Sequence, residues 1–163
     1  MQKLPSLRAA LVAAYPQLGR DPDRLTMWVD KGRIRSPMTT DRGFDCEYTL
    51  SITITDAVVD PAILWLAIND WLRINQPDLL RPGAGTGYTF EVDLIDLQTI
   101  DLAIELTLTE QIAVVTDGSG NTTIQYVGEP DLSWLEGGAM PTLPAGDMQT
   151  ITAVPGTPPA PGG

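Results

Sequence analysis

The residues with the clearest chemical potential are five carboxylates in a short span: Glu91, Asp93, Asp96, Asp101 and Glu105. Carboxylate oxygens are ligands that Mg²⁺ prefers in proteins, so such a set could form the centre of a metal-dependent nuclease. No lysine follows to complete that centre, and the chain contains no histidine, the most common general base and metal ligand. We therefore expect no catalytic residue, no metal ion and no cofactor, and keep a metal-dependent hydrolase as an alternative function.

The same carboxylates belong to a second pattern, the alternation of apolar and polar residues. Residues 44–55 alternate without interruption, and residues 88–94 and 100–109 repeat the pattern. A period of two predicts β-strands with one buried and one exposed face. Four of the carboxylates fall on the exposed phase, where charges are expected whether or not they have a role: Glu91, Asp93, Asp101 and Glu105.

Two helices are predicted from helical spacing and from the residues that start and stop helices. Leucine and alanine recur at helical spacing between residues 5 and 15, ahead of Pro16. The second helix starts with Asp60 as its N-cap and Pro61 at its first position. It ends just before Pro77, because a proline disfavours helical conformation at the preceding residue.

The turn residues complete the expected fold. Residues 25–36 are predicted to form a hairpin with its turn at residues 30–32, where Asp, Lys and Gly follow an apolar run. An Asp-Gly loop at residues 116–121 leads into a further hairpin strand at residues 122–127. The order of elements predicts an α+β fold, with an antiparallel or mixed β-sheet and two α-helices packed on one face.

The second helix carries more apolar surface than one buried face requires. Leu64, Ile68 and Trp71 line one side, and other apolar residues, among them Trp65 and Leu66, widen it. Two interpretations fit this breadth: burial on all sides within the core, or a second apolar face that binds a partner. In the second interpretation Trp65, Trp71 or both lie between subunits.

Charge is divided unevenly along the chain. Residues 1–81 hold all ten basic residues and ten acidic ones, whereas residues 82–163 hold eleven acidic residues and no basic one, so the net charge is −11. This balance argues against binding nucleic acid through a basic surface. It fits a solvated acidic surface, or a head-to-tail oligomer in which Arg33 and Arg35 contact the acidic sheet of a neighbouring copy.

Length and composition predict one compact domain and an extension. From residue 128 onward, glycine and proline fill fourteen of 36 positions, against fifteen of the preceding 127. We place the domain at residues 1–130 and a Pro/Gly-rich, acidic, partly flexible extension at residues 131–163. The longest apolar run, residues 62–68, is much shorter than the roughly 20 residues that cross a bilayer, so no membrane span is expected. The single Cys46 cannot form an intramolecular disulfide, which fits a reducing compartment.

A series of short motifs follows a recognisable order along the chain. It runs LPSLRAAL at residues 4–11, WVDKGRI at 28–34, LRINQPDLL at 72–80, GYTFEVDL at 87–94, IDLAIELTLTE at 100–110 and GEP at 128–130. This series resembles the phage tail completion protein R family of contractile-tailed phages. The resemblance covers about residues 4–130, and residues 131–163 have no counterpart in it.

The resemblance implies a structural tail terminator. Such proteins form a ring, here expected to be a hexamer, that caps the head-proximal end of the tail tube, ends tube and sheath assembly, and offers a docking surface for the neck or head. The implied partners are further copies of the chain, the tail tube protein, the sheath protein and a neck or head-completion protein, with DNA only passing through. The implied location is the tail of a virion or of a phage-tail-like particle, assembled in the host cytoplasm. A neck or sheath-end connector ring is the alternative role.

The acidic sheet face has two possible places in such a ring. It either lines the channel, where it would repel passing DNA, or contacts basic residues of the next subunit. The residues concerned are Glu91, Asp93, Asp101 and Glu105.

Overall fold

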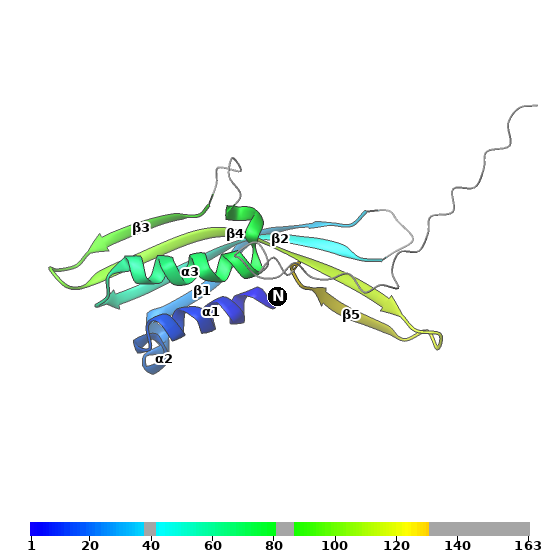
Figure 1. Cartoon of the computed structure of the whole chain (residues 1–163), viewed down its shortest axis with the longest axis horizontal. Coiled ribbons are helices and arrows are strands. Elements are labelled where there is room, and N and C mark those ends of the chain that lie inside the picture. The colour runs from blue at the N-terminus through cyan, green and yellow to red at the C-terminus, as the bar shows by residue number, and fades with distance from the viewer. Residues whose placement is uncertain (38–41, 81–86, 131–163) are drawn as a thin grey trace, which may run out of the picture. The chain divides into compact units, whose positions relative to one another are not determined.

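The structure, a computed structural model, describes residues 1–37, 42–80 and 87–130 (Figure 1). The chain divides into two units, residues 1–130 and residues 131–163. The predicted extension at residues 131–163 lies outside the described residues. The elements of the first unit, in chain order, are α1 (Lys3–Ala14), α2 (Gln17–Arg20), η1 (Pro22–Arg24), β1 (Leu25–Arg35), β2 (Phe44–Ala57), α3 (Pro61–Asn75), η2 (Pro77–Leu80), β3 (Thr89–Leu94), β4 (Ile100–Thr116) and β5 (Thr122–Val127).

The strands form one antiparallel sheet in the order β1-β2-β4-β3, and β5 pairs with the C-terminal part of β4. In the long central pair, Leu50 lies opposite Leu106 and Ile52 opposite Ile104. Residues that face each other across a ladder share a face, so the apolar phases of β2 and β4 coincide. The strands predicted from alternation are confirmed, and so is the α+β fold class.

α1 and α3 lie side by side and cover this apolar face (Figure 1). α3 begins as predicted, because the Asp60 carboxylate accepts a hydrogen bond from Ala62 N–H at 2.9 Å and Pro61 occupies the first helical position. The fully buried centre of the core contains Leu7 and Leu11 of α1, Leu64, Ile68 and Leu72 of α3, and Leu50, Ile54, Leu102 and Leu108 of the sheet. None of the described helices is long and apolar enough to cross a bilayer.

The predicted hairpin at residues 25–36 is wrong, because β1 runs as one strand from Leu25 to Arg35. Asp30 is an extra residue at a β-bulge within it. Its carboxylate accepts hydrogen bonds from Trp28 Nε1, at 2.7 Å, and from the Ser51 hydroxyl. These contacts hold the turn-forming residue within an extended strand, which bends at this point and does not reverse.

Gly32, the residue expected to close that turn, has a packing role. A Cβ at Gly32 would lie 3.0 Å from the carbonyl oxygen of Glu47 and 3.2 Å from the Cβ of Tyr48. Glycine thus permits the close approach of β1 to β2. Arg33 and Arg35 therefore lie on the edge strand β1 itself, and not on the separate second strand of a hairpin.

β3 and β5 are less covered than the alternation indicates. Phe90 and Leu94 share a face with the buried Ile104 and Ile100, yet their side chains are 50% and 79% exposed. Every residue of β5 is exposed. The helix layer therefore leaves apolar surface uncovered at both of these strands.

Candidate functional site

Four of the five carboxylates, Glu91, Asp93, Asp101 and Glu105, lie together on the outer sheet face, which we define as the face turned away from α1 and α3. Asp96 lies in the turn between β3 and β4, where its Oδ1 accepts hydrogen bonds from Gln98 N–H at 2.7 Å and Thr99 N–H at 2.8 Å. Across the β3–β4 pair, Asp93 stands directly opposite Asp101, and Glu105 stands opposite Thr89. Directly opposed like charges destabilise a sheet. Because Glu91, Asp93 and Glu105 are exposed, this arrangement gives the surface a negative potential and adds no stability to the single chain.

Asp101 also has a structural contact. Its Oδ1 accepts a hydrogen bond from Asp56 N–H at 2.8 Å, at the point where β2 is irregular and Asp56 has a φ of 51°. Among the residues that the structure describes, no group of three or more His, Cys, Asp or Glu side chains could hold a metal ion. The carboxylates of the described acidic face repel one another, and they do not form the metal-ligand set that the alternative hydrolase would need.

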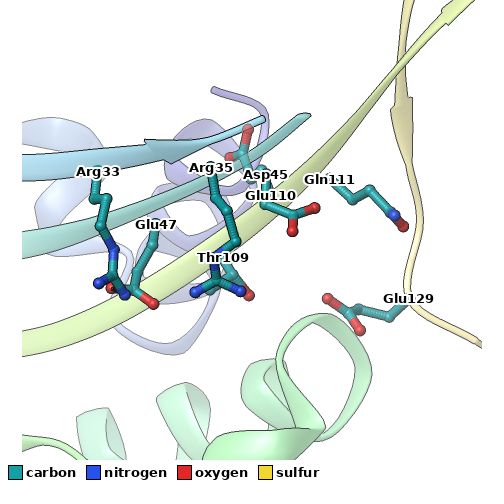
Figure 2. A pocket seen from close by; sticks show the side chains of 8 residues that line it. All are labelled: Arg33, Arg35, Asp45, Glu47, Thr109, Glu110, Gln111 and Glu129. Carbon is teal, nitrogen blue, oxygen red and sulfur yellow. Dashed lines mark hydrogen bonds and ion pairs between the residues drawn. The ribbon is translucent and has the colours of Figure 1, made fainter. Parts of the chain in front are cut away.

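Arg33 and Arg35 lie at the opposite edge of the sheet, on β1. Arg33 Nη2 forms an ion pair with Glu47 Oε1 of β2 at 2.9 Å, although the Arg33 side chain stays 64% exposed. Both arginines line an open pocket of about 330 Å³, and Figure 2 shows Arg33 and Glu47 extending side by side from neighbouring strands. The other lining residues are Asp45, Thr109, Glu110, Gln111 and Glu129. With two arginines against four carboxylates, the pocket does not favour an anionic ligand.

The structure separates the two tryptophans that were singled out on α3. Trp71 is 6% exposed and packs in the core, and its Nε1 donates a hydrogen bond to Ser6 Oγ of α1 at 2.9 Å. It therefore joins the two helices within one chain and has little surface left for a neighbour. Of the two tryptophans, Trp65 therefore remains the candidate for a contact between subunits.

Trp65 is half-buried at the surface between α3 and β3. Its ring lies against Phe90, with ring centroids 4.6 Å apart and planes tilted by 45°. Its Nε1 is buried and has no hydrogen-bond partner. A buried N–H without an acceptor costs about 1–3 kcal/mol, so this group calls for an acceptor that the described chain does not supply.

The apolar breadth of α3 has a simple structural basis. One face is buried against the sheet and α1, while Ile63, Leu66 and Ile74 are 46%, 61% and 74% exposed. These three residues exclude the interpretation in which the helix is buried on all sides. On the side of α3 that faces β3, Trp65 packs against Phe90, and we call Trp65, Phe90 and the exposed Leu94 the α3–β3 apolar surface.

Glu110 has a role that the sequence analysis missed. Its carboxylate accepts hydrogen bonds from Lys3 N–H at 2.9 Å, from Gln2 N–H at 3.2 Å and from the Tyr48 hydroxyl at 2.8 Å. A carboxylate at a helix N-terminus satisfies free N–H groups and interacts favourably with the helix dipole. Glu110 therefore anchors the start of α1 to the sheet, where the N-cap residue Gln2 makes no side-chain cap of its own.

Gln76, which follows the last residue of α3, fills a gap in the sheet. β3 pairs with β4 as far as Glu105 and β5 pairs with it from Gln111, so no strand of the described residues lies beside the edge of β4 between them. Gln76 Oε1 accepts from Thr109 N–H at 3.0 Å and from Lys3 Nζ at 2.7 Å. Its Nε2 donates to Thr109 Oγ1 and to Asp78 Oδ1, both at 2.7 Å. All four hydrogen-bonding positions of this buried amide are thus used.

A signal for Glu110 was present in the sequence. It falls on the apolar phase of β4, between the buried Leu108 and Ile112, where a charged residue requires partners. Burial disfavours its charged form, but the hydrogen bonds from Lys3 N–H, Tyr48 and Gln2 N–H outweigh burial and lower the pKa of Glu110 below its usual value. Gln76 offered no comparable signal, because only the fold brings it beside β4.

Replacing Glu110 by glutamine is expected to destabilise the protein by about 1–3 kcal/mol at pH 7, because an amide cannot accept all three hydrogen bonds. A depressed carboxylate pKa contributes stability above the unfolded-state pKa of about 4.3, and this contribution is lost as pH falls through the lower folded-state pKa. The difference between the wild type and Glu110→Gln should therefore shrink as the pH falls below about 4. Urea unfolding at pH 7, 5 and 3 measures it.

The matched control for this experiment is Glu105→Gln. Glu105 lies on the same strand but is exposed on the outer sheet face. Its replacement should change the free energy of unfolding by no more than about 0.5 kcal/mol at any of these pH values. A gap between wild type and Glu110→Gln that stays constant down to pH 3 would contradict the assigned role of the charge.

Comparison with known proteins confirms the family resemblance that the sequence motifs indicate. The family model of P2 phage tail completion protein R (GpR) matches residues 1–130, the unit that contains all the described elements. Tail completion protein R of Escherichia phage P2 is 36% identical over 132 residues, which are 80% of this chain and 84% of the phage protein. No solved structure matches the chain. The chain therefore belongs to the family of P2 phage tail completion protein R.

Proposed function

We propose that this protein is a tail terminator. Copies of it form a ring, a hexamer in our proposal, that caps the head-proximal end of the tail tube, ends the growth of tube and sheath, and presents a docking surface to the neck or head. The observation that carries this proposal is the family match over residues 1–130, which gives the chain a role in phage tail completion and a place in the virion tail.

The distribution of charge on the outer sheet face supports a head-to-tail ring. Arg33 and Arg35 lie on one edge strand, and Glu91 and Asp93 lie on the other. A repeated contact between two different surfaces of the same chain generates a ring when the rotation closes. Opposite charges at the two surfaces fix the register of such a contact and disfavour wrong pairings.

The α3–β3 apolar surface supports assembly independently of charge. Apolar side chains that stay exposed on a helix and its neighbouring strand are typical of a protein–protein contact. The Trp65 ring is only half-buried, so it offers part of its surface to a neighbouring subunit or to the tube protein.

The proposed role needs no catalysis. The carboxylates act as fixed surface charge: Glu91 and Asp93 on the edge strand β3 contact the next subunit, and Asp101 and Glu105 on the internal strand β4 face the channel and repel DNA. In this proposal the subunit contact and the channel, the two places that the sequence left open for the acidic face, are each occupied by two of the four carboxylates.

Negative-stain electron microscopy tests the proposal directly. The full chain is imaged alone and after mixing with purified tail tubes of the same particle. We expect closed rings with six-fold averages, and one cap at a single end of each tube, which then stops elongating when tube protein is added. Monomers that leave tube length unchanged would remove the terminator proposal, and rings that bind only the sheath or neck would assign the chain to a connector.

A further inference from the structure

Three strand edges of the sheet, those of β1, β3 and β5, have no backbone partner among the described residues. β1 pairs only with β2, and β3 pairs only with β4. Beyond these ladders, the carbonyl of Leu25 at the start of β1 accepts from Arg8, and the rest of the outer edges of β1 and β3 forms no backbone hydrogen bond with another described residue. An open edge presents a row of free N–H and C=O groups that another strand can pair with.

The open edges of β1 and β3 carry opposite charge on the same face. The segment of β1 after its bulge places Lys31, Arg33 and Arg35 on the outer sheet face, and all five residues from 31 to 35 are exposed. β3 places Glu91 and Asp93 on that face. Side by side, the two strands would set three cations against two carboxylates.

The opposite face of both edges is apolar. On β1 this face carries Ile34, which is 59% exposed, and on β3 it carries Phe90 and Leu94, which are 50% and 79% exposed. Two such edges match on both faces at once, with apolar side chains meeting on one side and opposite charges on the other. Cross-strand pairs of both kinds stabilise a sheet.

We infer that residues 31–35 of one copy pair with β3, residues 89–94, of the next copy, so that the sheets of neighbouring subunits join edge to edge. The bulge at Asp30 limits the pairing segment on β1 to the five residues after it, which is close to the six residues of β3. The occupant of each edge is a second copy of this chain, because the complementary charge pattern lies on the chain itself.

This inference rests on the proposed ring and adds the contact that closes it. Because β1 and β3 are different surfaces, every subunit uses both edges, one toward each neighbour in a closed ring. Residues 31–35 and 89–94, which would otherwise be prone to unspecific pairing, are then covered by main-chain hydrogen bonds.

Cross-linking between two single-cysteine variants tests the pairing. In a Cys46→Ala background, Arg33→Cys places a thiol at the middle of the β1 segment, and Glu91→Cys places one near the middle of β3. A short bis-maleimide reagent then joins thiols across the contact whichever way the strands run. Thr107→Cys, exposed on the same face but on the internal strand β4, is the matched control.

The expected product is a species of twice the chain mass on a denaturing gel, formed when the Arg33→Cys and Glu91→Cys variants are mixed. Either variant alone, or either one mixed with Thr107→Cys, should stay at the mass of one chain. A chain with both cysteines should give a ladder that ends at the number of subunits in the ring. Circular dichroism of each variant confirms that it is folded.

The other outcomes separate the inference from the proposed function. Rings in the microscope without cross-linked dimers overturn the edge pairing and leave the terminator ring intact. Dimers from one variant alone indicate a two-fold contact and also overturn it. Cross-linked ladders without closed rings support the edge pairing and remove the ring. If neither rings nor cross-linked dimers form, both the edge pairing and the terminator ring are overturned.

Discussion

Replacing Trp71 by alanine is expected to lower the free energy of unfolding by about 3–5 kcal/mol, the range for removing a large buried aromatic side chain. Trp71 is 6% exposed and its Nε1 donates to Ser6 Oγ, so the substitution leaves a cavity between α1 and α3 and breaks a link between them. Small domains have about 5–15 kcal/mol of stability, so the loss takes a large share of the total. Thermal and urea unfolding followed by circular dichroism measure it.

Two variants make this result interpretable. Trp71→Phe keeps most of the packing and loses the hydrogen bond, so it should cost clearly less than Trp71→Ala. Trp65→Ala removes a half-buried side chain and its contact with Phe90, but it also removes a buried N–H without an acceptor. These effects offset each other, so we expect a loss of no more than about 2 kcal/mol, built from an aromatic pair and partial burial.

The two alanine substitutions should therefore differ in the property that they change as well as in the size of the effect. Trp65→Ala is expected to remain a folded monomer that forms fewer rings, whereas Trp71→Ala loses stability first. Size-exclusion chromatography with light scattering, on samples shown to be folded, distinguishes the two. Equal destabilisation by both substitutions would place Trp65 in the core and remove it from the proposed interface.

The main strands could be predicted because their chemistry is local. In β2 and β4, most buried residues are separated from the next by one residue on the other face, so the pattern predicts both the strand and which of its faces is buried. The start of α3 was predictable for the same reason, since Asp60 and Pro61 act on adjacent N–H groups. The alternation on β3 is equally clear, but whether Phe90 and Leu94 are covered depends on the extent of the helix layer, which is not a local property.

The errors and omissions involve contacts between residues distant in sequence. Asp30 looked like a turn residue, and only its contact with Ser51, 21 positions away, shows why the strand continues through it. Gln76 binds Thr109, which lies 33 positions away. Glu110 could have been recognised as a charge on a buried phase, but its partner, the first turn of α1, lies more than 100 positions away. Helical spacing likewise showed that α3 has excess apolar surface, but it could not show which tryptophan faces outward.

Reversing the charges of one edge strand is expected to abolish ring formation, and reversing the other edge in a second variant should restore it in a mixture. Arg33→Glu with Arg35→Glu makes both edges of the chain acidic, and Glu91→Arg with Asp93→Arg makes both edges basic. Each variant alone then faces itself with like charges, which costs several kcal/mol across an interface. A loss of about 3 kcal/mol corresponds to a more than 100-fold weaker association.

The mixture has a different outcome because the contact is head-to-tail. When the two variants alternate around a ring, the acidic β3 of the first meets the unchanged basic β1 of the second, and the basic β3 of the second meets the acidic β1 of the first. Every contact is then complementary, provided that the number of subunits is even, as in a hexamer. Light scattering and microscopy of each variant alone and of the equimolar mixture, at low salt, measure the loss and the rescue.

The matched control adds positive charge to the internal strand. Ala103→Arg with Glu105→Arg places the same number of arginines on the same outer sheet face, but β4 has a strand on each side of these exposed residues. This variant should form rings as the wild type does, since its charges face the proposed channel and no neighbouring subunit. Rings that are lost equally in the edge and internal variants would show a general effect of net charge. Rings that survive reversal of Glu91 and Asp93 would assign the whole acidic face to the channel.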